Sequence, residues 1–317
     1  MGQAVIISII TPAYNAESYI AETVNSVLEA NIDYPFEYLV INDGSEDKTL
    51  EILNSFENRI TTLSHENIGE SLTVNRGLEI AKGKYILVLS ADDPLLTGEL
   101  INKAIAKLEK NDSIVALYPD WKIIDQSGNT TRTFILPDYS DEIMIGRCRC
   151  LPGPGTIFRR NGAIRIGGRR EKWKFVGDFD FWLRLSREGQ IERLSGVLAQ
   201  WRSNSGSASI SQRGLRMARE RVSVIEDFSN EFELPDVIKK MALGNAYYLA
   251  ARLCFFDPKV PGIRLLMSSF KFRKNWPEEA NVLGVIYILA SPIASKIVSA
   301  IPGLRSLILK KHARSSS

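Results

Sequence analysis

Residues 5–15 read VIISIITPAYN, and this stretch decides which kind of α/β fold the chain can adopt. Val5–Ile10 is apolar apart from Ser8, lacks a basic flank and is too short for a signal peptide or a membrane span, so we expect a buried strand. The turn that follows contains Pro12 and no glycine. Dinucleotide-binding and P-loop turns need glycines so that backbone N–H groups can approach a phosphate, and proline has no N–H. The turn therefore argues against a dehydrogenase, a P-loop NTPase and a nucleotidyltransferase.

Short apolar runs alternate with amphipathic helices through the first third of the chain. We expect further strands at residues 38–41, 60–63, 85–89, 114–118 and 191–201. A hairpin is expected over residues 121–136, a helix from Asp178 to Arg187, and helical structure after Gly214. Apolar strands separated by helices predict a mostly parallel sheet covered on both faces, in which ligands bind at the carboxyl ends of the strands.

Composition restricts the chemistry that the chain can perform. A chain of 317 residues predicts one main domain and a smaller appendage, and a net charge of +3 is too small to make nucleic acid the principal partner. Only two histidines and three cysteines are present, which argues against histidine metal sites, a Ser-His-Asp triad and a disulfide framework, and suits a reducing compartment. Carboxylates and backbone groups must therefore carry the chemistry.

Polar or aromatic residues follow the first two expected strands. Tyr14, after the first strand, either stacks on a nucleobase or simply packs. Asp43, after the second strand, accepts hydrogen bonds from a nucleobase or a ribose, or belongs to a turn in which Ser45 caps the next helix. The two descriptions of Asp43 are compatible.

Two adjacent carboxylates, Asp92 and Asp93, follow the strand expected at residues 85–89. Their mutual repulsion calls for compensation, and an Mg²⁺ or Mn²⁺ ion that shares a diphosphate would supply it. The alternative is a solvated turn started by Asp93-Pro94. The position at the carboxyl end of a strand favours the metal site.

Four residues in the stretch 177–185 fall on one helical face: Asp178, Phe181, Trp182 and Leu185. We expect the Asp178 carboxylate, on this apolar face, to be partly desolvated, which would raise its pKa and make it a base near neutral pH. Asp180, Arg184 and Arg187 are expected on a solvated face. Alternatively, Asp178 is the N-cap that follows Gly177.

Together these segments resemble the family 2 glycosyltransferases with the GT-A fold, over roughly residues 5–210. The matching stretches are Ile9–Asn15, Asn42–Asp47, Asn67–Gly69 with Asn75–Leu78, Leu89–Asp93, and Gly177–Asp178 leading into Trp182–Leu185. The resemblance implies a Rossmann-like, mostly parallel sheet flanked by helices, with a helical C-terminal extension.

The resemblance also implies a role for each stretch. The residues implied for nucleotide-sugar binding are Thr11, Pro12, Tyr14, Asp43, Asn75, Arg76 and Asp92. Asp92 and Asp93 match the acidic motif that binds Mg²⁺ or Mn²⁺, with Asp92 as the direct or water-mediated ligand. Asp178 matches the base of inverting members, which deprotonates an acceptor hydroxyl as its oxygen attacks the anomeric carbon.

Three positions depart from the family pattern: Ser90, Gly177 and Asn204 replace an acidic residue, a glutamate and a histidine. The departures at Ser90 and Asn204 keep a second function open, that of a non-catalytic nucleotide- or glycan-binding relative.

The domain expectation is a catalytic domain over residues 1–213 and a helical region over 214–317. Two apolar stretches of the latter, residues 282–295 and 297–309, have lysines and arginines nearby, which suits an anionic membrane surface, or helices that pack on the catalytic domain. We therefore expect a cytoplasmic protein, peripheral on the inner face of the cell membrane if these helices touch lipid, that transfers sugar to a glycan or lipid-linked acceptor in surface polysaccharide synthesis.

Overall fold

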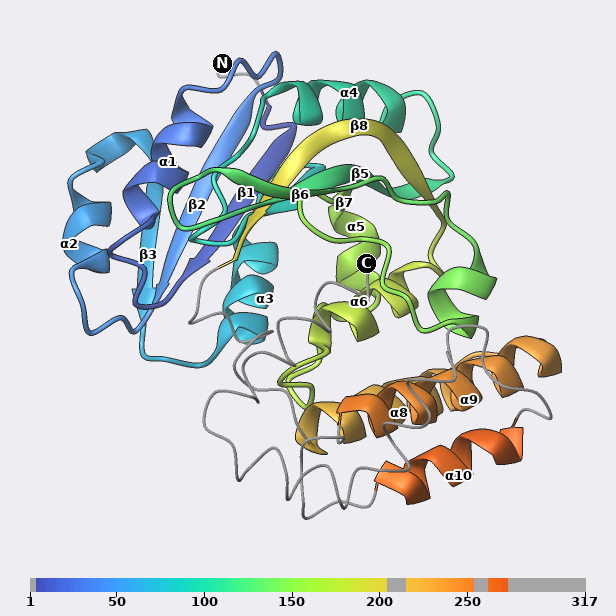
Figure 1. The fold of residues 1–317 in the computed structure, drawn as a ribbon. Helices are drawn as coiled ribbons and strands as arrows, with labels where there is room; N and C mark the ends of the chain where they lie inside the picture. Colours follow the sequence, from blue (N-terminus) through green and yellow to red (C-terminus); the bar gives the residue numbers. More distant parts are fainter. Residues whose placement is uncertain (1–3, 204–214, 254–261, 273–317) are drawn as a thin grey trace. The chain divides into compact units, whose positions relative to one another are not determined.

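A computed structural model describes residues 4–203, 215–253 and 262–272 of the chain (Figure 1). The chain divides into two compact units. The sheet unit consists of Met1–Ser140 and Cys150–Ser207, and the helical unit consists of Asp141–Arg149 and Ala208–Ser317. The domain boundary expected between residues 213 and 214 stays a prediction.

The sheet unit is built on one mixed sheet. Its strands are β1 (Ile7–Ala13), β2 (Phe36–Asp43), β3 (Thr61–His65), β4 (Tyr85–Val88), β5 (Ile114–Ile124), β6 (Thr130–Phe134), β7 (Ile157–Arg159) and β8 (Gln190–Arg202). They lie in the order β3-β2-β1-β4-β7-β5-β6, and β8 pairs with β5. The pairs β1–β2, β2–β3, β1–β4 and β5–β8 are parallel, whereas β7 and β6 pair antiparallel to their neighbours. The predicted mostly parallel sheet is confirmed.

Helices cover both faces of this sheet, as predicted. They are α1 (Ile20–Leu28), α2 (Thr49–Asn54), α3 (Glu70–Ile80), α4 (Glu99–Leu108), α5 (Arg160–Arg165) and α6 (Gly177–Leu185). The apolar stripes of α1 and α4 belong to one buried cluster with Ile7 and Ile9 of β1. Helix α3 covers the opposite face, where Gly77 lies so close to β1 that an added Cβ would stand 2.6 Å from Cγ2 of Ile10. Alternate residues of β1 thus bury their side chains on opposite faces.

An ion pair with a buried carboxylate joins the two longest strands. Nε and Nη2 of Arg193, on β8, donate to the two carboxylate oxygens of Asp120, on β5, at 2.9 and 2.7 Å. The backbone N–H groups of Leu136 and Gly196 donate to the same carboxylate. Burial by itself raises the pKa of Asp120, but the Arg193 guanidinium and the two N–H groups outweigh it, so the pKa is lowered.

Asp120→Asn is expected to reduce the free energy of unfolding by about 3 kcal/mol at pH 7, because it leaves the Arg193 charge without a buried partner. A carboxyl group whose pKa is lowered by folding contributes stability above its unfolded pKa of about 3.9, and this contribution is lost as the pH falls. Urea unfolding of both proteins at pH 7 and pH 3 should therefore show a smaller difference at pH 3. An equal difference at both pH values contradicts a charge-based contribution.

The helical unit contains α8 (Leu215–Glu231), α9 (Asp236–Leu253), α10 (Gly262–Phe272) and the π-helical turn η2 (Glu142–Gly146). Nδ2 of Asn245 on α9 donates to the carbonyl of Gly146 at 2.8 Å, which ties η2 to α9. No helix within the described ranges combines the length and apolar character needed to cross a membrane. The predicted C-terminal helices are confirmed for α8–α10. The apolar stretches 282–295 and 297–309 lie outside the described residues, so their membrane contact stays a prediction.

Candidate active site

The carboxyl ends of β1, β2 and β4 meet at one edge of the sheet because the three strands are parallel neighbours (Figure 1). Tyr14 follows β1, Asp43 ends β2, and Asp92 follows β4 within residues 90–95, which we call the acidic loop. The structure therefore brings together three of the predicted site residues. This edge is where ligands bind in sheets of this type.

Tyr14 and Thr11 lie in different environments. The Tyr14 side chain is 51% exposed, so its ring is available to a ligand. Thr11 is fully buried, and its Oγ1 lies 3.1 Å from the hydroxyl of Tyr38. Burial raises the pKa of Tyr38, and the two hydroxyls satisfy each other in the core. The structure thus gives the Thr11 side chain a core position, while Pro12 is partly exposed beside Tyr14.

The turn after β1 is fastened to the loop after β2. The backbone N–H of Asn15 donates to Oγ of Ser45 at 3.0 Å, and Oδ1 of Asn15 accepts from the N–H of Glu46 at 2.9 Å. The prediction that Ser45 caps the next helix is wrong, because α2 begins at Thr49 and Lys48 occupies the N-cap position. The hydroxyl of Ser45 instead helps to hold the residue that follows Tyr14.

Asp43 anchors the start of α3. Its side chain is 3% exposed, and its two carboxylate oxygens accept from the backbone N–H groups of Ile68 and Gly69 at 2.8 and 3.0 Å. Gly69 is the N-cap of α3 and has a φ of 89°, which favours glycine. Asp43 thus ends β2 and holds the start of α3, a role that neither description of it predicted, and its contact with a nucleotide stays a prediction.

The two carboxylates of the acidic loop differ in exposure and partners. Asp92 is partly exposed, whereas Asp93 is 4% exposed and its Oδ1 accepts from the backbone N–H of Arg202 at 2.6 Å. Burial, together with repulsion from Asp92, raises the pKa of Asp93 to about 8. Asp92 is thus the carboxylate of this pair that a ligand at the sheet edge can reach.

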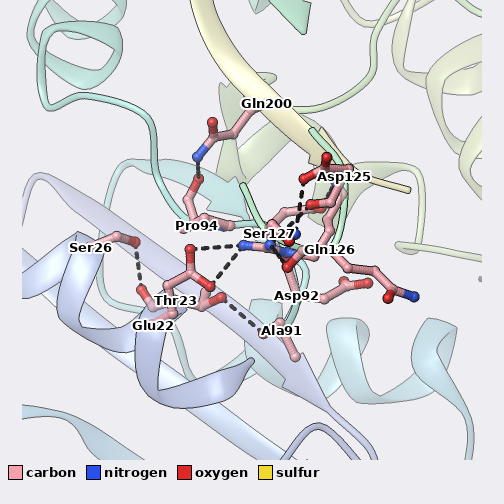
Figure 2. Close-up of polar contacts among 12 residues, drawn as sticks. Glu22, Thr23, Ser26, Ala91, Asp92, Pro94, Asp125, Gln126, Ser127 and Gln200 are labelled. Carbon is pink, nitrogen blue, oxygen red and sulfur yellow. Dashed lines mark hydrogen bonds and ion pairs between the residues drawn. The ribbon is translucent and has the colours of Figure 1, made fainter. Parts of the chain in front are cut away.

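The backbone of the acidic loop is held from two sides (Figure 2). On α1, Oγ1 of Thr23 donates to the Ala91 carbonyl at 2.9 Å, and Oγ of Ser26 accepts from the N–H of Leu95 at 2.8 Å. On β8, Nε2 of Gln200 donates to the carbonyl of Pro94 at 2.9 Å. These contacts make the loop a fixed platform for Asp92.

Asp178 lies in the first turn of α6 and is exposed. Two predictions about it are wrong: the side chain is not desolvated on the apolar face, and the N-cap position belongs to Val176. The apolar face of α6 packs further along the helix, where Phe181 and Trp182 form edge-to-face contacts with Phe158. The carboxylate therefore projects from the start of the helix, beyond this packed region.

The prediction of a solvated face for Asp180 and Arg184 is also wrong. Both are buried, and Nη2 of Arg184 donates to Oδ2 of Asp180 at 2.7 Å. Nη1 and Nη2 of Arg184 also donate to the carbonyls of Ile166 and Gly168. Their burial is tolerated because the charges compensate each other and the remaining donors are bonded. The pair ties α6 to the turn over residues 166–168.

Helix α3 holds the same turn and the start of α6. The side-chain amide of Asn75 donates to and accepts from the backbone of Arg169 at 2.8 and 2.7 Å, while Arg76 is exposed. A Cβ added to Gly177 would stand 3.2 Å from Oγ of Ser71, so the start of α6 lies beside the first turn of α3. Because Asp43 anchors that turn, Asp178 comes to the same edge of the sheet as Asp43.

Residues 8–164 match the model of the glycosyl transferase family 2. The chain carries a family 2 glycosyltransferase domain. An uncharacterized glycosyltransferase of Rickettsia conorii is 26% identical over 97% of this chain and 51% of its own length. The hyaluronan synthase of Pasteurella multocida is 25% identical over 71% of this chain and 23% of its own length. The chain thus spans about half, or less, of the length of these two curated relatives.

Solved structures confirm the GT-A fold of this family 2 domain. S. aureus TarS 1–349 in complex with UDP-GlcNAc has a TM-score of 0.66 and 20% identity, and the match covers 92% of this chain and 89% of that chain. The mannosyltransferase PcManGT from Pyrobaculum calidifontis, in complex with GDP-Man and Mn²⁺, has a TM-score of 0.52 and 15% identity over 92% of this chain and 87% of that chain.

The carboxylates of this family 2 domain could bind a cation together with a substrate diphosphate. Within the ranges that the structure describes, no group of three or more His, Cys, Asp or Glu side chains could hold a metal ion. Mg²⁺, however, is commonly bound through one or two carboxylates together with substrate phosphates. A partly exposed Asp92 beside a buried Asp93 suits a cation whose coordination a diphosphate completes.

Arg202 is not among the predicted site residues, although it contacts both aspartates of the acidic loop. The sequence signal was the stretch Trp201–Asn204, which resembles the family's loop after the sheet that can fold over the donor, but it gave Arg202 no role of its own. An arginine at the end of a strand is ordinarily a surface residue, so its burial could not be inferred from local pattern.

Proposed function

We propose that this protein transfers a sugar from a nucleotide-sugar donor to a hydroxyl of a glycan or lipid-linked acceptor. The observation that carries the proposal is the gathering of Tyr14, Asp43, Asp92 and Asp178 along one edge of the sheet of a family 2 glycosyltransferase domain. Each of these residues supplies a group that such a transfer needs: a stacking surface, hydrogen-bond acceptors, a cation ligand and a base.

The donor is proposed to lie over the ends of β1, β2 and β4. The exposed Tyr14 ring, directly after the end of β1, offers a surface for a nucleobase. Arg76 on α3 is exposed, and its guanidinium is proposed to approach the diphosphate. UDP-GlcNAc bound to TarS and GDP-Man bound to PcManGT support a nucleoside diphosphate sugar as donor.

The transfer is proposed to be a single displacement. Asp178 accepts the proton of the acceptor hydroxyl while the acceptor oxygen forms a bond to the anomeric carbon and the bond from that carbon to the diphosphate oxygen breaks. Asp92, with Asp93 behind it, would hold an Mg²⁺ or Mn²⁺ ion, which when bound offsets negative charge on the departing diphosphate. The Mn²⁺ in the PcManGT complex supports this cofactor. One displacement inverts the configuration at the anomeric carbon.

The acceptor is proposed to belong to a cell-surface polysaccharide. The likeness to a hyaluronan synthase supports a growing glycan as acceptor. A lipid-linked acceptor would bring the protein to the cytoplasmic face of the membrane. The basic and apolar C-terminal region, residues 271–317, is proposed to make that contact.

A thermal-shift screen of UDP- and GDP-sugars with and without Mn²⁺ tests the proposal. A donor at 100 times its Kd stabilises the folded state by about 2.7 kcal/mol, which raises Tm by roughly 5 °C or more for a domain of this size. We expect this shift for at least one sugar nucleotide, its loss with EDTA, and release of nucleoside diphosphate when a glycan acceptor is added. NADH serves as the control that should give no shift.

The outcomes separate the two candidate functions. A Mn²⁺-dependent shift without any hydrolysis or transfer of the donor would identify a non-catalytic binding relative, which the departures at Ser90 and Asn204 favour. No shift with any sugar nucleotide would contradict both.

A further inference from the structure

The guanidinium of Arg202 is buried and donates hydrogen bonds from all three of its nitrogens. Its side chain is 1% exposed. Nε donates to the Asp92 carbonyl at 2.9 Å, Nη1 to the carbonyls of Asp125 and Gln126 at 3.2 and 3.0 Å, and Nη2 to the two carboxylate oxygens of Glu22 at 2.8 Å each. Each of the three guanidinium nitrogens therefore donates to at least one protein oxygen. The Tyr19 ring lies 4.9 Å from the guanidinium carbon and covers it.

These contacts connect four parts of the sheet unit. Arg202 ends β8, Glu22 belongs to α1, Asp92 lies in the acidic loop, and Asp125-Gln126 form the turn between β5 and β6. Figure 2 shows Glu22, Asp92 and the Asp125–Gln126 turn converging on one point. A buried cation with a bidentate carboxylate partner and three carbonyl acceptors holds these segments at fixed distances.

The hydrogen bonds of Thr23 and Arg202 fix the backbone on both sides of Asp92. Thr23 holds the peptide group before Asp92 through the Ala91 carbonyl, and Arg202 holds the peptide group after it through the Asp92 carbonyl. Fixing the peptide planes on both sides of a residue fixes its φ and ψ, and therefore the direction of its Cα–Cβ bond. The backbone N–H of Arg202 holds the neighbouring Asp93 carboxylate as well.

We propose that Arg202, held in place by Glu22, is a positioning residue that aims the Asp92 carboxylate at the cation and diphosphate of the donor. The inference rests on the proposed function and adds to it the residues that set the affinity for the cation. Arg202 itself is not proposed to touch the cation or the diphosphate, because all three nitrogens of its buried guanidinium donate to protein oxygens. Its effect reaches the donor through the backbone of Asp92.

The arginine is required by geometry as well as by charge. A lysine has three donors at a single point and cannot reach Glu22, the Asp92 carbonyl and the turn over residues 125–126 at once. Arg202→Lys keeps the positive charge and the backbone N–H to Asp93 but frees the peptide group after Asp92. This substitution therefore breaks the connection among these segments while it keeps the charge.

The test measures Mn²⁺ binding to the full-length protein by the EPR signal of free Mn²⁺, in the presence of UDP or GDP, whichever the donor screen selects. Loss of a group that orients a metal ligand typically weakens metal affinity by about 10- to 100-fold, and we expect this for Arg202→Lys. Glu22→Ala removes the carboxylate partner of a buried arginine, so it should lower Tm; because the Glu22 side chain is half-exposed, water can take its place and the protein should still fold. We expect Mn²⁺ binding to weaken by less than about tenfold, because Arg202 keeps its contact with the Asp92 carbonyl.

Arg193→Lys is the matched control. It alters another arginine of β8, which donates to one carboxylate, that of the buried Asp120, and makes no hydrogen bond with the acidic loop. It should lower Tm and leave the Kd for Mn²⁺ within about twofold of wild type.

Each outcome of the Mn²⁺ binding measurements either supports or contradicts the positioning role of Arg202. Wild-type affinity in a folded Arg202→Lys protein overturns the inference, and so does wild-type affinity in Glu22→Ala if Arg202→Lys does not fold. If the wild-type protein binds no Mn²⁺ with either nucleotide, the proposed function itself fails. Weakened binding in both variants with an unaffected Arg193→Lys supports the inference.

Discussion

Asp178→Asn is expected to lower the rate of sugar transfer by about 10²- to 10⁴-fold, the usual contribution of a general base. Asparagine has nearly the same shape, and its carbonyl oxygen can still accept the 2.7 Å hydrogen bond from the N–H of Phe179, so α6 should remain in place. It cannot take a proton from the acceptor hydroxyl. Donor binding, proposed to take place over the ends of β1, β2 and β4, should be unchanged.

The measurement compares kcat for nucleoside diphosphate release, with acceptor present, against the Kd for the nucleotide with Mn²⁺. Asp112→Asn is a suitable control, because Asp112 is 91% exposed and precedes β5 at the opposite edge of the sheet from the candidate site. A variant at Asp178 that retains more than a tenth of the wild-type kcat would show that another group accepts the proton.

Asp92→Asn is expected to lower kcat/KM by about 10³-fold, which corresponds to about 4 kcal/mol of lost transition-state stabilisation. The physical reason is the loss of an anionic ligand to the cation, so the leaving diphosphate is no longer neutralised. Unlike Asp178→Asn, this change should also weaken nucleotide binding and abolish its dependence on Mn²⁺. The checks are kcat/KM for donor and the Kd for the nucleotide with Mn²⁺ or with EDTA.

Asp93→Asn is the informative comparison for Asp92→Asn. Asp93 is buried, and an amide oxygen can replace the carboxylate as acceptor for the N–H of Arg202. We expect a loss in kcat/KM below about tenfold, since Asp93 supports the loop from behind. Equal losses for the two variants would mean that both carboxylates bind the cation directly.

The α/β architecture follows from local pattern. Apolar runs such as Ile7–Ile10, and the helical stripe of Ile20, Val24 and Val27, are buried as their periodicity predicts. Parallel strands then place Tyr14, Asp43 and Asp92 at one edge, because the ends of such strands converge without any further information. The hairpin of β5 and β6 was likewise visible in its turn residues, Gln126–Asn129.

Burial of charged side chains could not be predicted in the same way. The helical pattern placed Asp178 on the apolar face and Asp180 and Arg184 in solvent, yet the structure exposes the first and buries the other two. The helical period of 3.6 residues shows which residues share a face of α6, but it does not show which other segments of the chain pack against that face. The carbonyls of Ile166 and Gly168, which make a buried Arg184 acceptable, come from a turn outside the helix.

The sequence by itself determined the parallel sheet, the edge that carries the candidate residues and the family to which the domain belongs, because these depend on residues close together in the chain. Only the tertiary structure decided which of two adjacent aspartates is partly exposed and which arginine is buried against their loop. Arg202 and Glu22 are separated by 180 positions, and the free energy of their contact depends on how fully the folded chain excludes water around it. No local pattern encodes that exclusion.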